Sequence, residues 1–250
     1  MAGTDLTTAV AVEVAKQLPI KDAYGDILSP AAKQAGGLVE DLAKTIRLAL
    51  APLQYTAALQ DRYVNFLNRS VRRVPDEQRI SPPPQILGPV LEGVKYESAD
   101  TPLSDMFSQL LSRAFDREHV SEAHPSYPAL IRQLSTDEAI LLQAFYAREL
   151  SGAYLNFQWK MDFDQATNMF SNRVVEVDDL PRDLLVFPKN ADFYMERLGV
   201  LGLAGVPQIG NQEPLADTSN RQIGIRAKHH IRLTPSGLRF MAAVSERPSD

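Results

Sequence analysis

Three consecutive prolines, Pro82–Pro84, constrain the fold of this chain more than any other feature of its sequence. Each proline lacks a backbone N–H and has a fixed φ, so the run favours an extended polyproline path. Pro89 follows shortly after it. We therefore expect a rigid connector between helices at residues 80–89. A proline-rich ligand for a partner domain is the alternative that the sequence leaves open.

Helical patterns lie on both sides of this connector. Apolar residues recur near helical spacing between Lys21 and Val74, whereas residues 1–20 are weakly patterned. Thr101-Pro102 supplies an N-cap and a first-turn proline, and it predicts a helix whose apolar face runs to Phe115. Ser135–Glu138 has the form of a capping box and predicts the start of another helix.

The second half of the chain is organised differently. Helical sequence around Tyr154–Phe170 is followed, after further apolar segments, by a polar loop at Gly205–Asn220. Gln222–Ile225 and Lys228–Leu233 then predict two short strands, and Thr234-Pro235 predicts a final helix. This order of elements resembles a winged-helix domain.

The predicted fold is therefore mainly α, with an N-terminal helical module followed by a helical, winged-helix-like module that contains a short β-hairpin. The expected parts are a flexible or weakly helical arm at 1–20, the helical module at 21–128 with its connector at 80–89, and the winged-helix-like module at 129–250.

Composition excludes several classes of protein. The 250 residues include no cysteine, which rules out disulfides, thiol nucleophiles and cysteine-liganded zinc, and which fits a reducing cytosol. No glycine-rich phosphate loop or nucleophile elbow is present. The pairs His119/His124 and His229/His230 are wrongly spaced to share a metal. We expect no enzyme activity, no cofactor and no metal.

Neither a secretory signal nor an apolar run of about 20 residues is found, and this favours a cytoplasmic protein in a bacterium. Five apolar residues upstream of the connector nevertheless share a helical stripe. They are candidates for a face that contacts a partner, or a membrane after activation. These residues are Leu38, Leu42, Ile46, Leu50 and Leu53.

The charge distribution contains one anomaly. The net charge of the whole chain is −5, but residues 218–245 contain no acidic residue and five cations. A basic hairpin of this kind binds either nucleic acid or an acidic protein surface. The acidic surface can belong to another protein or to another part of the same chain. The five candidate contact residues are Arg221, Arg226, Lys228, Arg232 and Arg239.

Several ordered motifs resemble the Abi-alpha family. They are Ala23–Lys33, Ile80–Pro84, Gly88–Tyr96, Leu103–Leu111 and His124–Glu138. The resemblance covers roughly Lys21–Tyr146 and continues more loosely beyond it. It implies a bacterial protein associated with abortive infection, a defence in which infected cells stop supporting phage. It supplies no catalytic residues.

The resulting hypothesis is a non-enzymatic antiphage defence protein that acts through a neighbouring defence protein or a phage component, with membrane-active N-terminal helices as one means of execution. Homo-oligomers are the default expectation for a soluble chain. The alternative is a winged-helix DNA-binding regulator that uses the basic segment at 221–239, and an enzyme is the third hypothesis.

Overall fold

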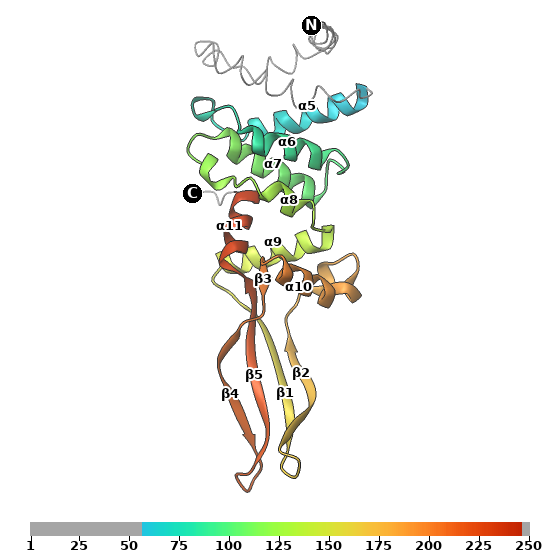
Figure 1. Cartoon of the computed structure of the whole chain (residues 1–250), viewed down its shortest axis with the longest axis vertical. Coiled ribbons are helices and arrows are strands. Elements are labelled where there is room, and N and C mark those ends of the chain that lie inside the picture. The colour runs from blue at the N-terminus through green and yellow to red at the C-terminus, as the bar shows by residue number, and fades with distance from the viewer. Residues whose placement is uncertain (1–56, 247–250) are drawn as a thin grey trace, which may run out of the picture. The chain divides into compact units, whose positions relative to one another are not determined.

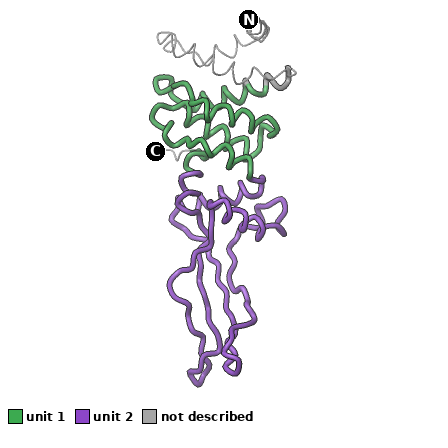
Figure 2. The backbone as a smooth tube through the Cα atoms, viewed as in Figure 1, with its two compact units in different colours: residues 1–133, 242–250 green, residues 134–241 purple. Residues whose placement is uncertain are grey.

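The computed structural model describes residues 57–246, in which helices and a large antiparallel sheet alternate along the chain (Figure 1). Two compact units make up the chain (Figure 2). Unit 1 comprises Met1–Gln133 together with Ala242–Asp250, and unit 2 comprises Leu134–Met241. Unit 2 is therefore a continuous segment inserted into unit 1.

The described part of unit 1 is helical. It contains α5 (Ala57–Val71), α6 (Pro84–Val94), α7 (Pro102–Phe115), α8 (Tyr127–Ile131), and the short 3-10 turns η1 (Asp76–Gln78) and η2 (Val120–Glu122). Helix α7 is the centre of this unit, since α5, α6, α8 and η2 all contact it. Its apolar side chains, such as Phe107 and Phe115, are fully buried.

Helices α6 and α7 approach each other closely at Gly93. A Cβ at this position would overlap with the ring of Phe107. Because only glycine lacks a Cβ, Gly93 allows the aromatic ring to pack directly on the α6 backbone.

The proline run leads directly into a helix. Pro83 is extended, with φ −56° and ψ 132°, and Pro84 is the first residue of α6, which also contains Pro89. Proline is favoured at the first helical position because its missing N–H has no intrahelical partner there. The expected helix after Thr101 is confirmed, since the Thr101 side chain accepts a hydrogen bond from the Ser104 N–H.

Unit 2 combines helices with the sheet. Helix α9 (Thr136–Leu150) begins with the predicted capping box between Ser135 and Glu138. Helix α9 packs against the longest strand, β5, and its residues Leu141, Leu142 and Phe145 are buried. The other elements are β1 (Leu155–Asp164), β2 (Met169–Asp178), η3 (Arg182–Leu184), η4 (Pro188–Asn190), α10 (Ala191–Val200), β3 (Ala204–Gly205), β4 (Gln208–Ala216), β5 (Gln222–Leu233) and α11 (Pro235–Val244).

The sheet consists of two long hairpins joined side by side. Strands β1 and β2 form one hairpin, β4 and β5 form the other, and β1 pairs with β5 between them (Figure 1). The short strand β3 pairs with the end of β5. All of these pairings are antiparallel, so β2 and β4 form the outer edges along most of the sheet.

The expectation of a mainly α fold with a winged-helix module is wrong, because a five-stranded sheet dominates unit 2. The expected helix around Tyr154–Phe170 is the β1–β2 hairpin, and the expected loop at Gly205–Asn220 contains β4. The two short strands predicted at 222–225 and 228–233 are one continuous strand, β5. The final helix after Thr234 is confirmed.

Both hairpins end in turns that combine an aspartate with an asparagine. Asp164 accepts hydrogen bonds from the Ala166 N–H and the Thr167 hydroxyl, and Asn168 follows with a φ of 54°. Asp217 likewise accepts from the Ser219 N–H, and Asn220 has a φ of 61°. Asparagine tolerates positive φ better than most residues, so these side chains close the turns and set the register of the strands.

Candidate functional site

The two faces of the sheet differ in chemistry because side chains alternate along each strand. Trp159 of β1 lies opposite Val175 of β2 and Ala227 of β5, whereas the next residue, Lys160, lies opposite Val174 and Arg226. We name the face that carries Trp159 the apolar face. It comprises Leu155, Phe157, Trp159, Met161, Phe163, Phe170, Arg173, Val175, Ile223, Ile225, Ala227, His229 and Ile231.

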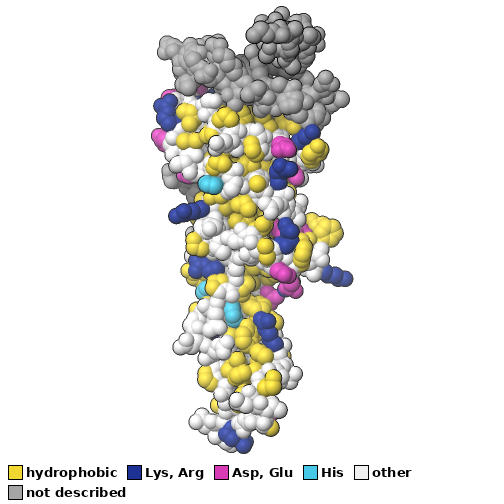
Figure 3. All heavy atoms as spheres, viewed as in Figure 1, with side chains coloured by type: hydrophobic (Ala, Val, Ile, Leu, Met, Phe, Trp, Pro, Cys, Tyr) yellow, Lys and Arg dark blue, Asp and Glu magenta, His cyan; other side chains and the backbone are white. Residues whose placement is uncertain are grey.

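The apolar face is covered only at one end. Leu155 and Ile231, which pair at the start of β1, are buried, and so is the small Ala227 in the middle of the face. Ile223, next to the turn of its hairpin, is 48% exposed, and Val175, opposite Trp159, is 49% exposed. Phe170 is 39% exposed, although its ring contacts that of Phe163 at 4.9 Å between centroids. Hydrophobic side chains with few charges among them are visible along the hairpins in Figure 3.

The middle of the apolar face is an aromatic cluster with one cation. The Arg173 guanidinium lies 5.0 Å from the centre of a Trp159 ring and 5.8 Å from the Phe157 ring. His229 contacts both aromatic residues at 6.0 Å between centroids. Arg173 is exposed and forms no ion pair with any residue between 57 and 246, so within the described chain its charge meets only the electron-rich ring faces.

The opposite face, which we name the charged face, holds a chain of ion pairs. Arg226 donates two hydrogen bonds to the Glu176 carboxylate, at 2.6 Å and 3.0 Å. Lys160 Nζ lies 3.5 Å from the same carboxylate, and Lys228 pairs with Glu213 of β4. The hydrogen bond from Arg226, followed by that from Gln158, lowers the pKa of Glu176 from 4.5 to about 2.

Four of the five predicted basic contact residues are paired with carboxylates of unit 2. Besides the pairs of Arg226 and Lys228, Arg221 pairs with Asp217 at 3.1 Å, and Arg232 pairs with Glu149 of α9 at 3.1 Å. The fifth, Arg239, is exposed on α11 and has no ion pair with the residues that the structure describes. These five residues therefore do not form one free basic surface. Nothing in this arrangement favours DNA binding, and the paired cations agree with the alternative of acidic partners within the same chain.

The predicted apolar stripe lies outside the described residues. Leu38, Leu42, Ile46, Leu50 and Leu53 all precede residue 57, and their proposed contact with a partner or a membrane stays a prediction. Within residues 57–246, each helix is too short or too polar to traverse a bilayer.

The histidines lie in ordinary local contacts. His119 Nδ1 is 2.9 Å from the buried Asp116 carboxylate, and His124 Nδ1 is 2.8 Å from the Ser126 hydroxyl. His229 joins the aromatic cluster, whereas His230 stacks on Tyr154 at 4.4 Å. Across residues 57–246 no group of three or more histidine, cysteine, aspartate or glutamate side chains is arranged to hold a metal ion.

A comparison with known protein families finds a match that covers the central and C-terminal parts of the chain. Residues 49–244, well over half of the chain, match the family described as abortive infection alpha, Abi-alpha. The chain belongs to the Abi-alpha family. The match confirms the resemblance predicted from the motifs, and the name of the Abi-alpha family suggests a role in abortive infection. No curated protein and no solved structure matches the chain.

Sequence reasoning located the basic residues of this Abi-alpha protein but missed the apolar face. A signal for that face was present, since Leu155, Phe157, Trp159, Met161 and Phe163 alternate with polar residues over the whole of β1. Such alternation is typical of a half-buried strand and not of a helix.

Proposed function

We propose that this Abi-alpha protein acts in antiphage defence as a non-enzymatic binding protein, and that it binds a partner protein through the apolar face of its sheet. The partner is a phage component or a neighbouring defence protein. The observation that carries this proposal is the aromatic cluster of Phe157, Trp159 and Arg173 on a sheet face that is open towards its hairpin turns.

The composition of this face supports protein binding. Contiguous exposed apolar surface is uncommon on soluble proteins and marks interaction sites. Tryptophan and arginine are also enriched among the residues that contribute most to the affinity of protein interfaces. Trp159 is the one tryptophan of the chain, and it lies half-buried at the centre of this face.

The same cluster indicates the chemistry of the partner. Apolar side chains of a partner would bury Val175, Ile223 and Phe170, which are more than a third exposed in the free chain. Arg173 would then lose water without gaining an ion pair from residues 57–246. A buried unpaired charge is unfavourable, so a matching partner presents an apolar surface with a carboxylate that reaches Arg173.

A plaque assay tests this proposal, in cells that carry the gene alone or with its chromosomal neighbours. Val175→Asp places a negative charge on the apolar face and is expected to abolish protection. Val174→Asp is the matched control, because Val174 is the adjacent residue, is 48% exposed against 49% for Val175, and lies on the charged face.

Circular dichroism of both purified variants verifies that they fold. Protection that survives Val175→Asp as well as Val174→Asp would contradict a binding role for the apolar face. Protection in no arrangement, across diverse phages, would contradict the defence function itself.

A further inference from the structure

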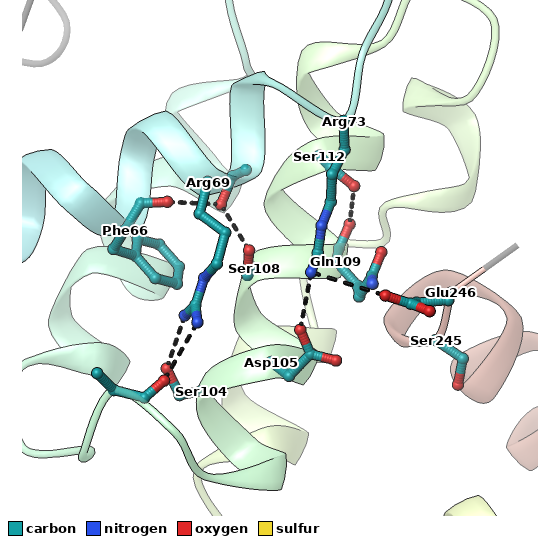
Figure 4. Close-up of polar contacts among 12 residues, drawn as sticks. Phe66, Arg69, Arg73, Ser104, Asp105, Ser108, Gln109, Ser112, Ser245 and Glu246 are labelled. Atoms are coloured by element: carbon teal, nitrogen blue, oxygen red, sulfur yellow. Dashed lines mark hydrogen bonds and ion pairs between the residues drawn. The ribbon is translucent and has the colours of Figure 1, made fainter.

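Unit 1 contains a polar pocket that the proposed function does not use. It lies among the end of α5, helix α7 and the residues that follow α11, several of whose side chains are drawn in Figure 4. Its volume is about 200 Å³. Its lining residues are Arg73, Val74, Gln109, Ser112, Arg113 and Glu246. All of them belong to unit 1.

Helix α7 carries several buried polar residues, which is unusual for the central helix of a unit. Some of these residues line the pocket. One pair, Ser104 and Ser108, faces α5 and is fully satisfied. Ser108 shares a hydrogen bond of 3.0 Å with Ser70, and Ser104 accepts one of 3.1 Å from Arg69 (Figure 4). A second set of polar residues, which includes Gln109 and Ser112, lines the pocket.

Gln109 is the unusual member of this second set. The residue is only 3% exposed, yet its side-chain Nε2 has no hydrogen-bond partner. A buried amide donor without an acceptor is unfavourable by about 1–3 kcal/mol. In a pocket, this cost is removed by a ligand that brings an acceptor atom.

Two arginines line the pocket, and each lies beside a carboxylate of the chain. Arg113 donates hydrogen bonds to the carbonyl oxygens of Ala242 and Ser245, at 3.0 Å and 3.1 Å, and its Nε lies 3.3 Å from the Glu122 carboxylate. Arg73 lies nearer the solvent, 3.1 Å from Asp105. Guanidinium groups favour phosphate and carboxylate oxygens, to which they can donate two parallel hydrogen bonds.

A carboxylate of the chain itself lies beside this donor set. Glu246 Oε1 is 3.9 Å from Arg73 Nη2, beyond hydrogen-bonding distance, and the Glu246 side chain is 79% exposed (Figure 4). Such an exposed, long ion pair contributes little to stability, so Glu246 is easily displaced by a stronger anion.

We propose that this pocket binds a phosphate group, in competition with the Glu246 carboxylate. The Arg73 guanidinium and the Gln109 amide donate hydrogen bonds to the phosphate oxygens, and Arg113, which is paired with Glu122, lines the pocket beside them. A phosphate dianion carries more charge than Glu246, and it supplies the acceptor that Gln109 lacks. The ligand is inorganic phosphate or the phosphate of a small metabolite, because the volume leaves room for little more.

Isothermal titration calorimetry of the full chain with inorganic phosphate tests the proposal, at constant ionic strength. The expected result is saturable binding with one site per chain, weakened about tenfold or more by Arg73→Met and by Gln109→Leu. Glu246→Gln is expected to strengthen binding, because it removes the competing charge from an exposed residue and leaves the fold intact. Arg117→Met is the matched control, since Arg117 is exposed in unit 1 and does not line the pocket.

Thermal unfolding adds a second measurement that does not depend on tight binding. Gln109→Leu removes an unpaired buried amide and is expected to fold at least as stably as the wild type, while losing the phosphate-induced rise in Tm. A parallel titration with acetate separates the two anion classes, and a small phosphomonoester separates free phosphate from a metabolite-borne one.

Three outcomes would overturn the proposal. They are the absence of saturable phosphate binding, equal weakening by Arg117→Met and Arg73→Met, and acetate binding as tight as phosphate binding. The pocket and the apolar face lie in different units and have separate tests, so failure of one leaves the other standing.

Discussion

Arg226 of β5 and Glu176 of β2 form a two-point ion pair across the strand that separates them, β1. Their two hydrogen bonds measure 2.6 Å and 3.0 Å, and Gln158 of β1 donates a third bond of 2.8 Å to the same carboxylate. Because β2 and β5 belong to different hairpins, these bonds join the two hairpins on the charged face. Glu176 thus adds a side-chain link between the hairpins to the backbone pairing of β1 with β5.

The first prediction concerns acid stability. The hydrogen bonds from Arg226 and Gln158 lower the pKa of Glu176 from 4.5 to about 2 in the folded chain. A lowered pKa means that the ionised carboxylate stabilises the fold above pH 4.5, and that this contribution is lost as the pH falls from 4.5 towards 2. In this range, the urea midpoint of the wild type should fall more steeply than that of Glu176→Gln.

The control for this comparison is Glu196→Gln, on the exposed side of α10. This variant should keep the steep fall of the wild type. Equal slopes for the wild type and Glu176→Gln would show that the ion pair does not stabilise the sheet.

The second prediction compares two glycines of α6, Gly88 and Gly93, whose tertiary surroundings differ. Gly93→Ala would force a methyl group into the Phe107 ring and should destabilise the chain by about 1–3 kcal/mol. At Gly88 a Cβ would meet no neighbour from elsewhere in the fold, and only the following Pro89 would restrict the new side chain, so Gly88→Ala should destabilise the chain less than Gly93→Ala. Chemical denaturation measures both changes. Equal effects of the two substitutions would contradict the close contact of α6 and α7.

The third prediction concerns Trp159 as a natural fluorescent probe. Arg173→Met removes the guanidinium that covers the Trp159 ring, so acrylamide should quench the emission of this variant more strongly. Loss of an exposed cation–π contact should also reduce the free energy of unfolding by about 0.5–1 kcal/mol. Arg221→Met, at the turn of the other hairpin, should leave the quenching unchanged. An unaltered Stern–Volmer slope for Arg173→Met would place the arginine away from the ring in solution.

The fourth prediction concerns nucleic acid. Since Arg226 and Lys228 are paired with Glu176 and Glu213, substituting both cations by glutamine should leave retention on a duplex-DNA column unchanged at every salt concentration. Salt-dependent retention that these substitutions abolish would instead establish a basic DNA-binding surface on β5.

Local signals in the sequence predicted where three of the helices begin. Thr101 and Ser135 cap their helices through contacts within three residues, so their effect is readable from sequence alone. The same holds for the final helix after Thr234, whose hydroxyl accepts a hydrogen bond from the Gly237 N–H.

The sheet was missed because its pairings connect distant residues. Strand β2 alone shows no clear apolar alternation, and β4 contains Gly210 and Pro214, which are typical of loops. Long-range pairing also hid the charge balance. Arg226 meets a carboxylate 50 positions away, and Arg232 meets one 83 positions away. A stretch that is purely basic in sequence is therefore nearly neutral in space.

The insertion of unit 2 into unit 1 also determines when the chain can complete its fold during synthesis. Arg113 on the central helix of unit 1 binds the carbonyl oxygens of Ala242 and Ser245, which the ribosome adds 129 and 132 residues later. At bacterial translation rates, that interval lasts roughly 10 seconds. During this time the Arg113 guanidinium lacks both acceptors, although unit 2 can already form as a continuous segment. The inserted unit is thus free to mature first on the ribosome, and unit 1 is completed only after all of unit 2 has been synthesised.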